Sequence, residues 1–313
     1  MRTWASIKYG LFAFAALASL DNVTAFPGTT LKPLARIEAI YPEGVEWIRG
    51  SLYFAEMYAE RVMVLSDGKL KAFWKGENCG PTSISSFGDG VLVTCHLSDS
   101  LLMLDMNGLP LRRFVADKNG IPFNNPNDSY PDRQGGVYFT ASGDFSLNAK
   151  HTGKVLYLDA ANQIHVCAES MQYANGIVFD SSKSRILISE HLGKKITSFQ
   201  VRAPCDFIEE KELSTTKQWE TQFSFNTTYA LSGPDGLTLD KEGNLVVAYY
   251  GAGALIVLDS LHRPRSYVKT PFQYVTNVSI SPDQEYMAVS GSYINDEPPY
   301  TGEILVLKRS HLY

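Results

Sequence analysis

The most informative absences in this 313-residue chain concern positive charge and catalytic motifs. The sequence has 28 Lys and Arg residues against 33 Asp and Glu residues and contains no basic cluster, so nucleic acid is not an expected partner. It contains no Gly-x-Ser-x-Gly elbow and no Cys-His arrangement, which removes the usual signals of covalent catalysis. Glycine-rich phosphate loops and dinucleotide-binding fingerprints, which mark nucleotide sites, are missing as well.

Cysteine is scarce, and its spacing argues against a zinc site. The four cysteines are Cys79, Cys95, Cys167 and Cys205, and none of them belongs to a CxxC pair. Cys79 and Cys95 lie near one predicted hairpin and could form a disulfide bond. Four buried free thiols are the alternative.

The N-terminal segment has the pattern of a secretory leader. A positively charged start precedes residues 10–20, an apolar run that is too short to span a bilayer. Candidate cleavage sites follow Ala18 and Ala25. We therefore predict a signal peptide over residues 1–25 and a secreted or periplasmic mature chain, in a location where disulfides are permitted. An uncleaved membrane anchor is the alternative, and no later stretch approaches the ~18 apolar residues of a transmembrane helix.

A strand–turn–strand unit recurs along the rest of the chain. Its six copies cover residues 52–66, 91–105, 137–159, 186–199, 245–259 and 287–307. A short segment with a small polar residue precedes each copy, at 43–47, 80–84, 126–128, 174–177, 234–237 and 276–279. Self-similar units that recur at roughly 40 to 60 residues are typical of β-propellers.

These repeats predict an all-β protein, a six-bladed β-propeller with four-stranded antiparallel blades around a central channel. Residues 26–313 would form it as a single domain, since no Pro-, Ser- or Gly-rich linker divides the chain. The longest insertion, 204–231, is expected to be a loop between the fourth and fifth blades. A β-sandwich or several small β-domains are the alternative, although neither needs the same polar dipeptide before every third or fourth strand.

Four of the six preceding segments carry a strong oxygen ligand, namely Glu43, Asn127, Asn175 and Asp235. In a propeller the inner strands surround the channel, so residues at one end of each inner strand converge. Two carboxylates and two amide carbonyls suit Ca²⁺ better than Mg²⁺ or Mn²⁺ and match Zn²⁺ poorly. The sequence therefore predicts one divalent cation, calcium. The alternative is that these residues only form turns, as Asn-Gly, Asp-Gly and Pro-Asp dipeptides often do.

The motifs resemble those of the regucalcin/gluconolactonase family, the senescence-marker-protein-like calcium-dependent lactonases. The resemblance is carried by Glu-Gly-Val-Glu-Trp (43–47), Pro-Asn-Asp (126–128), Ala-Asn-Gly-Ile (174–177) and Pro-Asp-Gly-Leu (234–237). It covers roughly residues 40 to 308. It implies a six-bladed propeller, a calcium ion held by Glu43, Asn127, Asn175 and Asp235, and hydrolysis of lactones or related esters.

Three departures from the family pattern bear on the substrate. Val45 replaces the usual Pro of the opening motif, and Ala141 begins Ala-Ser-Gly-Asp where Asp-Pro is frequent. Asn125 occupies the place where sugar-lactone members often carry an Arg that contacts substrate hydroxyls, and we assign Asn125 to substrate binding. These departures leave the metal ligands intact but weaken the case for a sugar lactone.

Asp235 and Asp128 are the catalytic candidates. A metal ion can polarise an ester carbonyl, but calcium acidifies water only weakly, so a side-chain base is expected. The resemblance gives Asp235 a role in both metal binding and proton transfer. Asp128 lies beside Asn127 and is the second candidate, with capping of a turn as its alternative role.

Further substrate contacts are expected from His96, His191 and Tyr250. The two histidines directly follow the second strand of the second and fourth repeats, and either could act as a base near neutral pH. Rim histidines without a chemical role, and a tyrosine packed in the core, are the alternatives.

The leading functional prediction is an exported, calcium-dependent hydrolase of lactones or small esters. A strictosidine-synthase-like propeller enzyme that performs a non-hydrolytic step is one alternative. A ligand-binding propeller with purely structural calcium is another. The four-ligand set favours the hydrolase. We expect a small-molecule substrate and a monomer, since a closed ring leaves no long unpaired strand edge.

Overall fold

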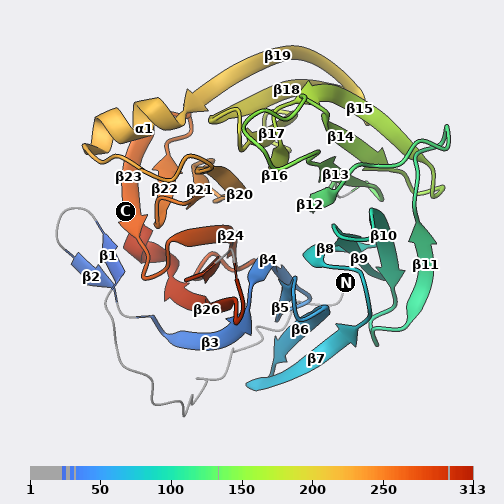
Figure 1. The fold of residues 1–313 in the computed structure, drawn as a ribbon, viewed down its shortest axis with the longest axis horizontal. Helices are drawn as coiled ribbons and strands as arrows, with labels where there is room; N and C mark the ends of the chain where they lie inside the picture. The colour runs from blue at the N-terminus through green and yellow to red at the C-terminus, as the bar shows by residue number, and fades with distance from the viewer. Residues whose placement is uncertain (1–22, 26–28, 32, 133, 295–296, 313) are drawn as a thin grey trace, which may run out of the picture.

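Runs of Val, Ile, Leu and aromatic residues that alternate with turn residues form strands, which pair antiparallel with their neighbours. The computed structural model describes residues 23–25, 29–31, 33–132, 134–294 and 297–312. In it, six sheets surround a common centre (Figure 1). The prediction of an all-β, six-bladed propeller with four-stranded antiparallel blades is confirmed, and the β-sandwich alternative is wrong.

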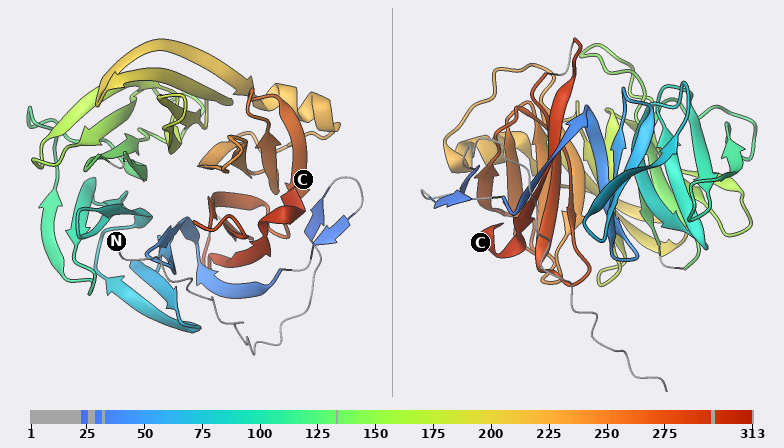
Figure 2. Two further views of the ribbon diagram at one scale, coloured as in Figure 1. Left: turned by 180° about the vertical axis from the view of Figure 1, so that it is seen from behind. Right: turned by 90° about the horizontal axis from the view of Figure 1, so that it is seen from below.

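Each blade starts at the centre with one inner strand and ends at the rim. The strands of blades 1 to 3 are β4 (Pro42–Ile48), β5 (Ser51–Glu56), β6 (Arg61–Ser66) and β7 (Lys69–Lys75); β8 (Pro81–Phe87), β9 (Gly90–Cys95), β10 (Ser100–Leu104) and β11 (Pro110–Phe114); and β12 (Pro126–Pro131), β13 (Val137–Ala141), β14 (Gly153–Leu158) and β15 (Ile164–Met171). Those of blades 4 to 6 are β16 (Ala174–Asp180), β17 (Arg185–Glu190), β18 (Lys195–Ala203) and β19 (Asp206–Thr215); β20 (Gly233–Leu239), β21 (Leu245–Tyr250), β22 (Ala254–Leu258) and β23 (Pro264–Lys269); and β24 (Tyr274–Ile280), β25 (Tyr286–Ser292), β26 (Thr301–Lys308) and β3 (Ala35–Ile40). The side view in Figure 2 shows that the strands cross the thickness of the ring, so every blade has an end at each face.

The ring is closed by a strand from the beginning of the described chain. β3 pairs antiparallel with β26 as the outermost strand of blade 6, with Ile40 opposite Thr301 and Ala35 opposite Val306. Blade 6 therefore combines strands from both ends of the domain. A repeat count shows only contiguous units, so it did not reveal this closure.

The sheet of blade 5 has two additional short strands, β1 (Val23–Ala25) and β2 (Thr29–Leu31). β1 pairs antiparallel with β23 and comprises the last three residues of the segment predicted to be a leader. The leader boundary stays a prediction. No helix in the described part of the chain is long and apolar enough to cross a membrane.

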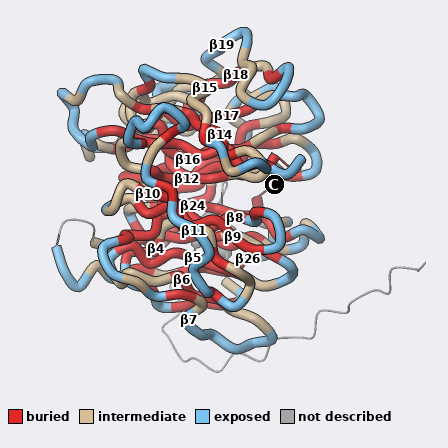
Figure 3. The backbone as a smooth tube through the Cα atoms, turned by 90° about the vertical axis from the view of Figure 1, so that its right-hand side faces the viewer, coloured by how far each residue is buried: buried red, intermediate tan, exposed pale blue. Residues whose placement is uncertain are grey.

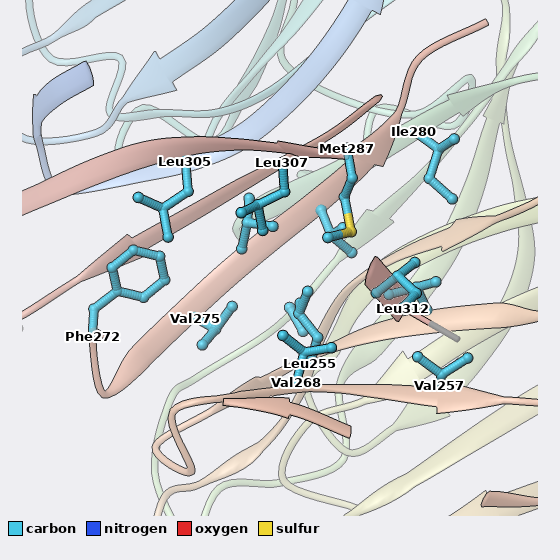
Figure 4. Close-up of a cluster of buried hydrophobic side chains, with 14 residues drawn as sticks. Leu255, Val257, Val268, Phe272, Val275, Ile280, Met287, Leu305, Leu307 and Leu312 are labelled. Atoms are coloured by element: carbon cyan, nitrogen blue, oxygen red, sulfur yellow. The ribbon is translucent and has the colours of Figure 1, made fainter. Parts of the chain in front are cut away.

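The hydrophobic core lies between neighbouring blades. Between blades 5 and 6, Leu255 and Val257 of β22 join one cluster with Met287 of β25 and Leu305 of β26 (Figure 4). Similar clusters occupy the other junctions. The tube in Figure 3 shows buried strands inside the ring and exposed loops at its faces. Each blade is thus fixed by apolar burial against two neighbours, which positions the ends of the inner strands.

The prediction that residues 204–231 form a loop is wrong for most of that segment. β19 supplies the outer strand of blade 4, and α1 (Thr216–Phe223) follows it at the rim (Figure 1). Thr215 caps the helix, and the fully buried Trp219 packs edge-on against Tyr249 at 5.4 Å between ring centroids. Only Thr216 and Trp219 of the helix are buried, so its apolar periodicity was too weak to detect from the sequence.

All four cysteines form disulfide bonds, so the alternative of free thiols is wrong. Cys79–Cys95 links the segment before β8 to the end of β9, as the hairpin suggested. Cys167–Cys205 links β15 of blade 3 to the turn before β19 of blade 4. The second bond therefore joins adjacent blades, a pairing that the sequence did not indicate.

Candidate functional site

The four predicted metal ligands occupy equivalent positions on four inner strands. Glu43 lies in β4, Asn127 in β12, Asn175 in β16 and Asp235 in β20. Every inner strand has a break in its pairing register at this point, for example between Pro126 and Ser129 and between Pro234 and Leu237. A bulge re-aims side chains next to it. The alternative that these dipeptides only form turns is wrong, because they lie inside strands.

The glycines that follow three of these residues are required by close approach of the inner strands. A Cβ atom on Gly176 would lie 2.2 Å from the carbonyl oxygen of Asp235, and one on Gly236 would lie 2.3 Å from the side chain of Asn277. No side chain fits at such distances. The Asn-Gly and Asp-Gly pairs are therefore a packing requirement of the point where neighbouring inner strands approach each other.

A hydroxyl group from the preceding blade holds the backbone of each ligand. Thr94 donates to the carbonyl oxygen of Asn127 at 2.7 Å, and Thr140 donates to that of Asn175 at 2.6 Å. Ser189 and Ser290 donate in the same way to the carbonyl oxygens of Asp235 and Glu43. All four hydroxyl residues are fully buried. We call them the hydroxyl clamps.

Sequence reasoning missed the hydroxyl clamps, although the repeat carries their signal. Each clamp stands at the same position of the second strand of its blade. The corresponding residues in blades 1 and 5 are Ala55 and Ala248. Those blades precede Thr82 and Thr276, the two equivalent inner-strand residues that are not predicted ligands. A hydroxyl residue therefore occupies this second-strand position in every blade that is followed by a blade with a predicted ligand.

The side-chain amides are oriented toward oxygen coordination. The Asn127 Nδ2 atom donates to Ser142 Oγ at 3.0 Å, and the Asn175 amide donates to the Asp235 carboxylate. Both nitrogens are therefore engaged by the protein. Among the described residues, no donor is bonded to the Oδ1 atom of either carboxamide, which is the atom that calcium would use.

Three carboxylates repel one another at this site. Burial, and then the charge of Asp128, raise the pKa of Glu43 from its ordinary value of 4.5 to about 8. Burial raises the pKa of Asp128 from 3.8 to about 7. Burial, and then the charges of Glu43 and Asp128, raise the pKa of Asp235 well above its ordinary range. In the part of the chain that the structure describes, no Lys or Arg side chain forms an ion pair with any of the three.

This environment fits a divalent cation. Concentrated negative charge, two free carboxamide oxygens and the near absence of nitrogen ligands are what calcium requires. The described residues contain no group of three or more His, Cys, Asp or Glu side chains arranged to hold a metal. The predicted ligand set differs in composition, since it combines two carboxylates with two carboxamides.

His191 follows β17 and contacts Asp235. Its Nδ1 atom is buried 3.6 Å from Asp235 Oδ2 and has no hydrogen-bond partner among the described residues. Its Nε2 atom lies 2.9 Å from the carbonyl oxygen of Leu231, so Nε2 carries the proton and donates it. Burial lowers the pKa of His191 to about 4, which keeps the ring neutral. A lone pair on Nδ1 therefore faces the Asp235 carboxyl group.

The three other residues predicted to contact the substrate do not all lie beside His191. Tyr250 ends β21, and its ring lies 5.4 Å from that of His191, so it belongs to the same site. The side chain of His96 is directed at the Pro126 carbonyl oxygen, with its Nδ1 atom at 3.1 Å. Asn125 donates from Nδ2 to the carbonyl oxygen of Gly143 at 3.0 Å. His96 and Asn125 thus bind the backbone beside blade 3.

Asp128 follows the predicted ligand Asn127 in β12 and lies close enough to Glu43 and Asp235 to raise the pKa of both. It accepts hydrogen bonds from the backbone of Ser129 at 2.8 Å and from the side chains of Ser83 and Asn277. It borders a cavity of about 550 Å³ that all six inner strands line, toward their C-terminal ends. The cavity therefore begins next to the predicted ligands, and Asp128 borders it.

Comparison with known proteins agrees with this geometry. Residues 41–292 match the SMP-30/gluconolactonase/LRE-like region. The chain is 25% identical over 256 residues to lactonase drp35 of Staphylococcus saprophyticus, covering 78% of this chain and 75% of that protein. An uncharacterized protein of Sulfolobus acidocaldarius is 27% identical, with 69% and 74% covered.

Solved structures share the fold at low sequence identity. A gluconolactonase from Xanthomonas campestris superposes with a TM-score of 0.72 at 18% identity, over 93% of this chain and 95% of that one. A calcium-binding regucalcin from Agrobacterium tumefaciens superposes with a TM-score of 0.67 at 16% identity, over 88% and 95%. The family match spans most of the propeller, and the predicted family is confirmed. The chain belongs to the SMP-30/gluconolactonase/LRE-like family.

Proposed function

We propose that this protein is an exported, calcium-dependent hydrolase of lactones or small esters. The observation that carries the proposal is the ligand ring, formed by Glu43, Asn127, Asn175 and Asp235, whose backbones are held by the hydroxyl clamps. The lactonase and gluconolactonase names among its relatives support lactone hydrolysis. The family match also favours hydrolysis over the strictosidine-synthase-like alternative.

The ligand ring would hold calcium, with Glu43 and Asp235 supplying charge and the two asparagines supplying carbonyl oxygens. Bound there, the ion would polarise the lactone carbonyl and stabilise the oxyanion that forms on attack. The structurally similar regucalcin of Agrobacterium tumefaciens is a calcium-binding protein, which supports this assignment.

Asp235 and His191 would handle the proton. The attacking water adds its oxygen to the lactone carbonyl carbon, and its proton passes to the Asp235 carboxylate. The lone pair on His191 Nδ1 lies 3.6 Å from Asp235 Oδ2 and would face the carboxyl group once it carries that proton, while the ring itself stays neutral. Cleavage of the ring C–O bond returns a proton to the leaving alkoxide, so the product is a hydroxy acid. Asp128 is the second candidate, but its carboxyl group already accepts hydrogen bonds from Ser129, Ser83 and Asn277.

Metal content and activity of the purified mature chain test this function. We expect stoichiometric calcium and hydrolysis of at least one member of a panel of lactones and aryl esters. Chelation should abolish turnover, and added calcium should restore it. Calcium without turnover on any panel member would favour a ligand-binding propeller, and failure to bind calcium would refute the ligand ring.

Export is supported by two features of the chain. The first 25 residues have the leader pattern, and both disulfides, Cys79–Cys95 and Cys167–Cys205, are of the kind that persists in oxidising compartments. Expression of the full chain with N-terminal sequencing of the extracytoplasmic fraction tests this part. A product retained in the cytoplasm with an intact N-terminus would contradict export.

The hydroxyl clamps lead to a prediction for Ser189→Ala. We expect calcium affinity to fall about 10- to 100-fold, since residues that orient a ligand typically have effects of that size. Calorimetric titration with calcium measures it. Ser85→Ala is the matched control, because Ser85 is a buried hydroxyl that hydrogen-bonds Ser129 and holds no ligand. Equal calcium affinity in both variants would show that the clamp only stabilises the fold.

A further inference from the structure

Aromatic rings gather at the same end of the propeller as the ligand ring. Tyr58 stacks on Tyr300, with ring centroids 4.2 Å apart, and contacts Tyr41 edge-on at 4.9 Å. The hydroxyl groups of Tyr41 and Tyr250 lie 3.3 Å apart, and the Tyr250 ring lies 6.4 Å from that of Phe145. These contacts form one continuous chain of rings from blade 1 to blade 3.

Both ends of this chain lie beside the proposed catalytic groups. Tyr41 lies two residues before Glu43, directly ahead of the same inner strand, and the Tyr58 ring packs against it at 4.9 Å. Phe145 packs edge-on against His191 at 5.4 Å, and His191 in turn contacts Asp235. Phe145 is therefore one side chain away from the proposed base.

The terminal rings are exposed while the rings between them are buried. Tyr58 is 42% exposed and Phe145 is 39% exposed, whereas Tyr41 and Tyr250 are 8% and 5% exposed. Their neighbours hold both rings in place, yet a large part of each surface remains open. Fixed, exposed aromatic surface next to a reactive site favours a flat apolar group of a ligand.

Three polar side chains at this end, those of Asn125, Tyr41 and Tyr250, already form hydrogen bonds within the protein. Asn125, at the position where the resemblance expects an Arg, donates its side-chain amide to Gly143 and its backbone N–H to the Asp99 carboxylate. The Tyr41 and Tyr250 hydroxyls are paired with each other. A polyhydroxylated lactone would lose hydrogen bonds to water that these three side chains are not placed to replace, whereas an aryl substituent has no such bonds to lose.

We propose that this enzyme selects lactones or esters that carry an aromatic or similarly flat apolar substituent, and that Phe145 and Tyr58 determine this specificity. The inference rests on the proposed lactone hydrolysis. The ester group would lie at the ligand ring, and the substituent would lie against the exposed faces of Phe145 or Tyr58. Polyhydroxylated sugar lactones would be poor substrates.

Three lactones with the same five-membered ring test the proposal: one with a phenyl group, one with a methyl group and one polyhydroxylated. We expect kcat/KM to be highest for the phenyl compound. Phe145→Ala should raise KM for the phenyl lactone about tenfold, with a much smaller change in KM for the methyl lactone. Phe145→Tyr should retain the wild-type KM. Leu147→Ala is the control, since Leu147 is 62% exposed in the same loop and makes none of these ring contacts.

The outcomes separate this inference from the proposed function. If lactones are hydrolysed but the polyhydroxylated compound is preferred, or if Phe145→Ala affects the phenyl and methyl compounds equally, the specificity inference is refuted and hydrolysis stands. If no lactone or ester is cleaved, the proposed function fails. In that case, calorimetric titration with the phenyl lactone tests the aromatic site separately. Weaker binding by Phe145→Ala than by the wild-type protein would support the site, and equal binding by both proteins or no binding by either would refute it.

Discussion

Asp235→Asn is expected to abolish lactone hydrolysis while making the calcium-free protein more stable. The substitution keeps the shape of the side chain but removes a charged ligand and the proposed base, and loss of a general base alone costs about 10²- to 10⁴-fold in rate. Burial, and then repulsion by Glu43 and Asp128, disfavour that charge in the calcium-free fold and raise the pKa of Asp235 well above its ordinary range. Removal of the charge relieves that repulsion. Steady-state kinetics and thermal unfolding in chelator measure the two effects.

A buried carboxylate at the other end of an inner strand provides the matched control. Asp180 ends β16 and accepts hydrogen bonds from Ser182 and Lys183, away from the ligand ring. Asp180→Asn should lower the unfolding temperature and leave kcat unchanged. Turnover in Asp235→Asn above a tenth of the wild-type rate would contradict the role of Asp235. A lowered unfolding temperature of the calcium-free variant would contradict the repulsion.

The stability of the calcium-free protein is expected to fall as the pH rises from 5 to 8. The pKa of Glu43 is raised from 4.5 to about 8 and that of Asp128 from 3.8 to about 7. Between those values the folded chain binds more protons than the unfolded chain, so the free energy of unfolding decreases with increasing pH. A bound cation favours the ionised carboxylates, and saturating calcium should therefore restore the stability lost at pH 8.

Thermal unfolding from pH 5 to pH 9, in chelator and in excess calcium, measures this effect. The stabilisation by calcium should grow with pH and reach several degrees or more at pH 8. Glu43→Gln removes a carboxyl group whose pKa is higher than that of Asp128, and it should flatten the profile in chelator. Parallel profiles with and without calcium would show that these carboxylates do not couple to the cation.

The repeat, and the equivalent placement of the four predicted ligands on their inner strands, were both predictable because each depends on local sequence. A strand–turn–strand unit can be recognised from a short stretch of sequence, and its sixfold recurrence indicated the propeller and its number of blades. Bulged inner strands present the residue after the proline or alanine at a common level. The positions of Glu43, Asn127, Asn175 and Asp235 within the repeat were thus sufficient to indicate that they converge.

The supports of the site depend on contacts between blades. Ser189 reaches Asp235, and Thr140 reaches Asn175, across a blade junction. The repeat showed a hydroxyl residue at each of these positions, but its role became clear only from the backbone carbonyl oxygen that it bonds in the next blade. The repeat likewise indicated that His191 follows the second strand of its blade, but it did not indicate which ring nitrogen would face Asp235.

Ring closure, the rim helix and the aromatic chain were outside the reach of the sequence for one physical reason. β3 pairs with β26 across almost the whole length of the chain, as the Arg36–Glu303 bond also shows. Trp219 stabilises α1 through a distant tyrosine, and the rings from Tyr58 to Phe145 come from separate blades. Local patterning determined the repeated strands, the number of blades and the positions of the predicted ligands, since those depend on neighbours in the chain. The choice of partners depended on which surfaces the closed ring brought together, because the free energy of such long-range contacts exists only once the ring is formed.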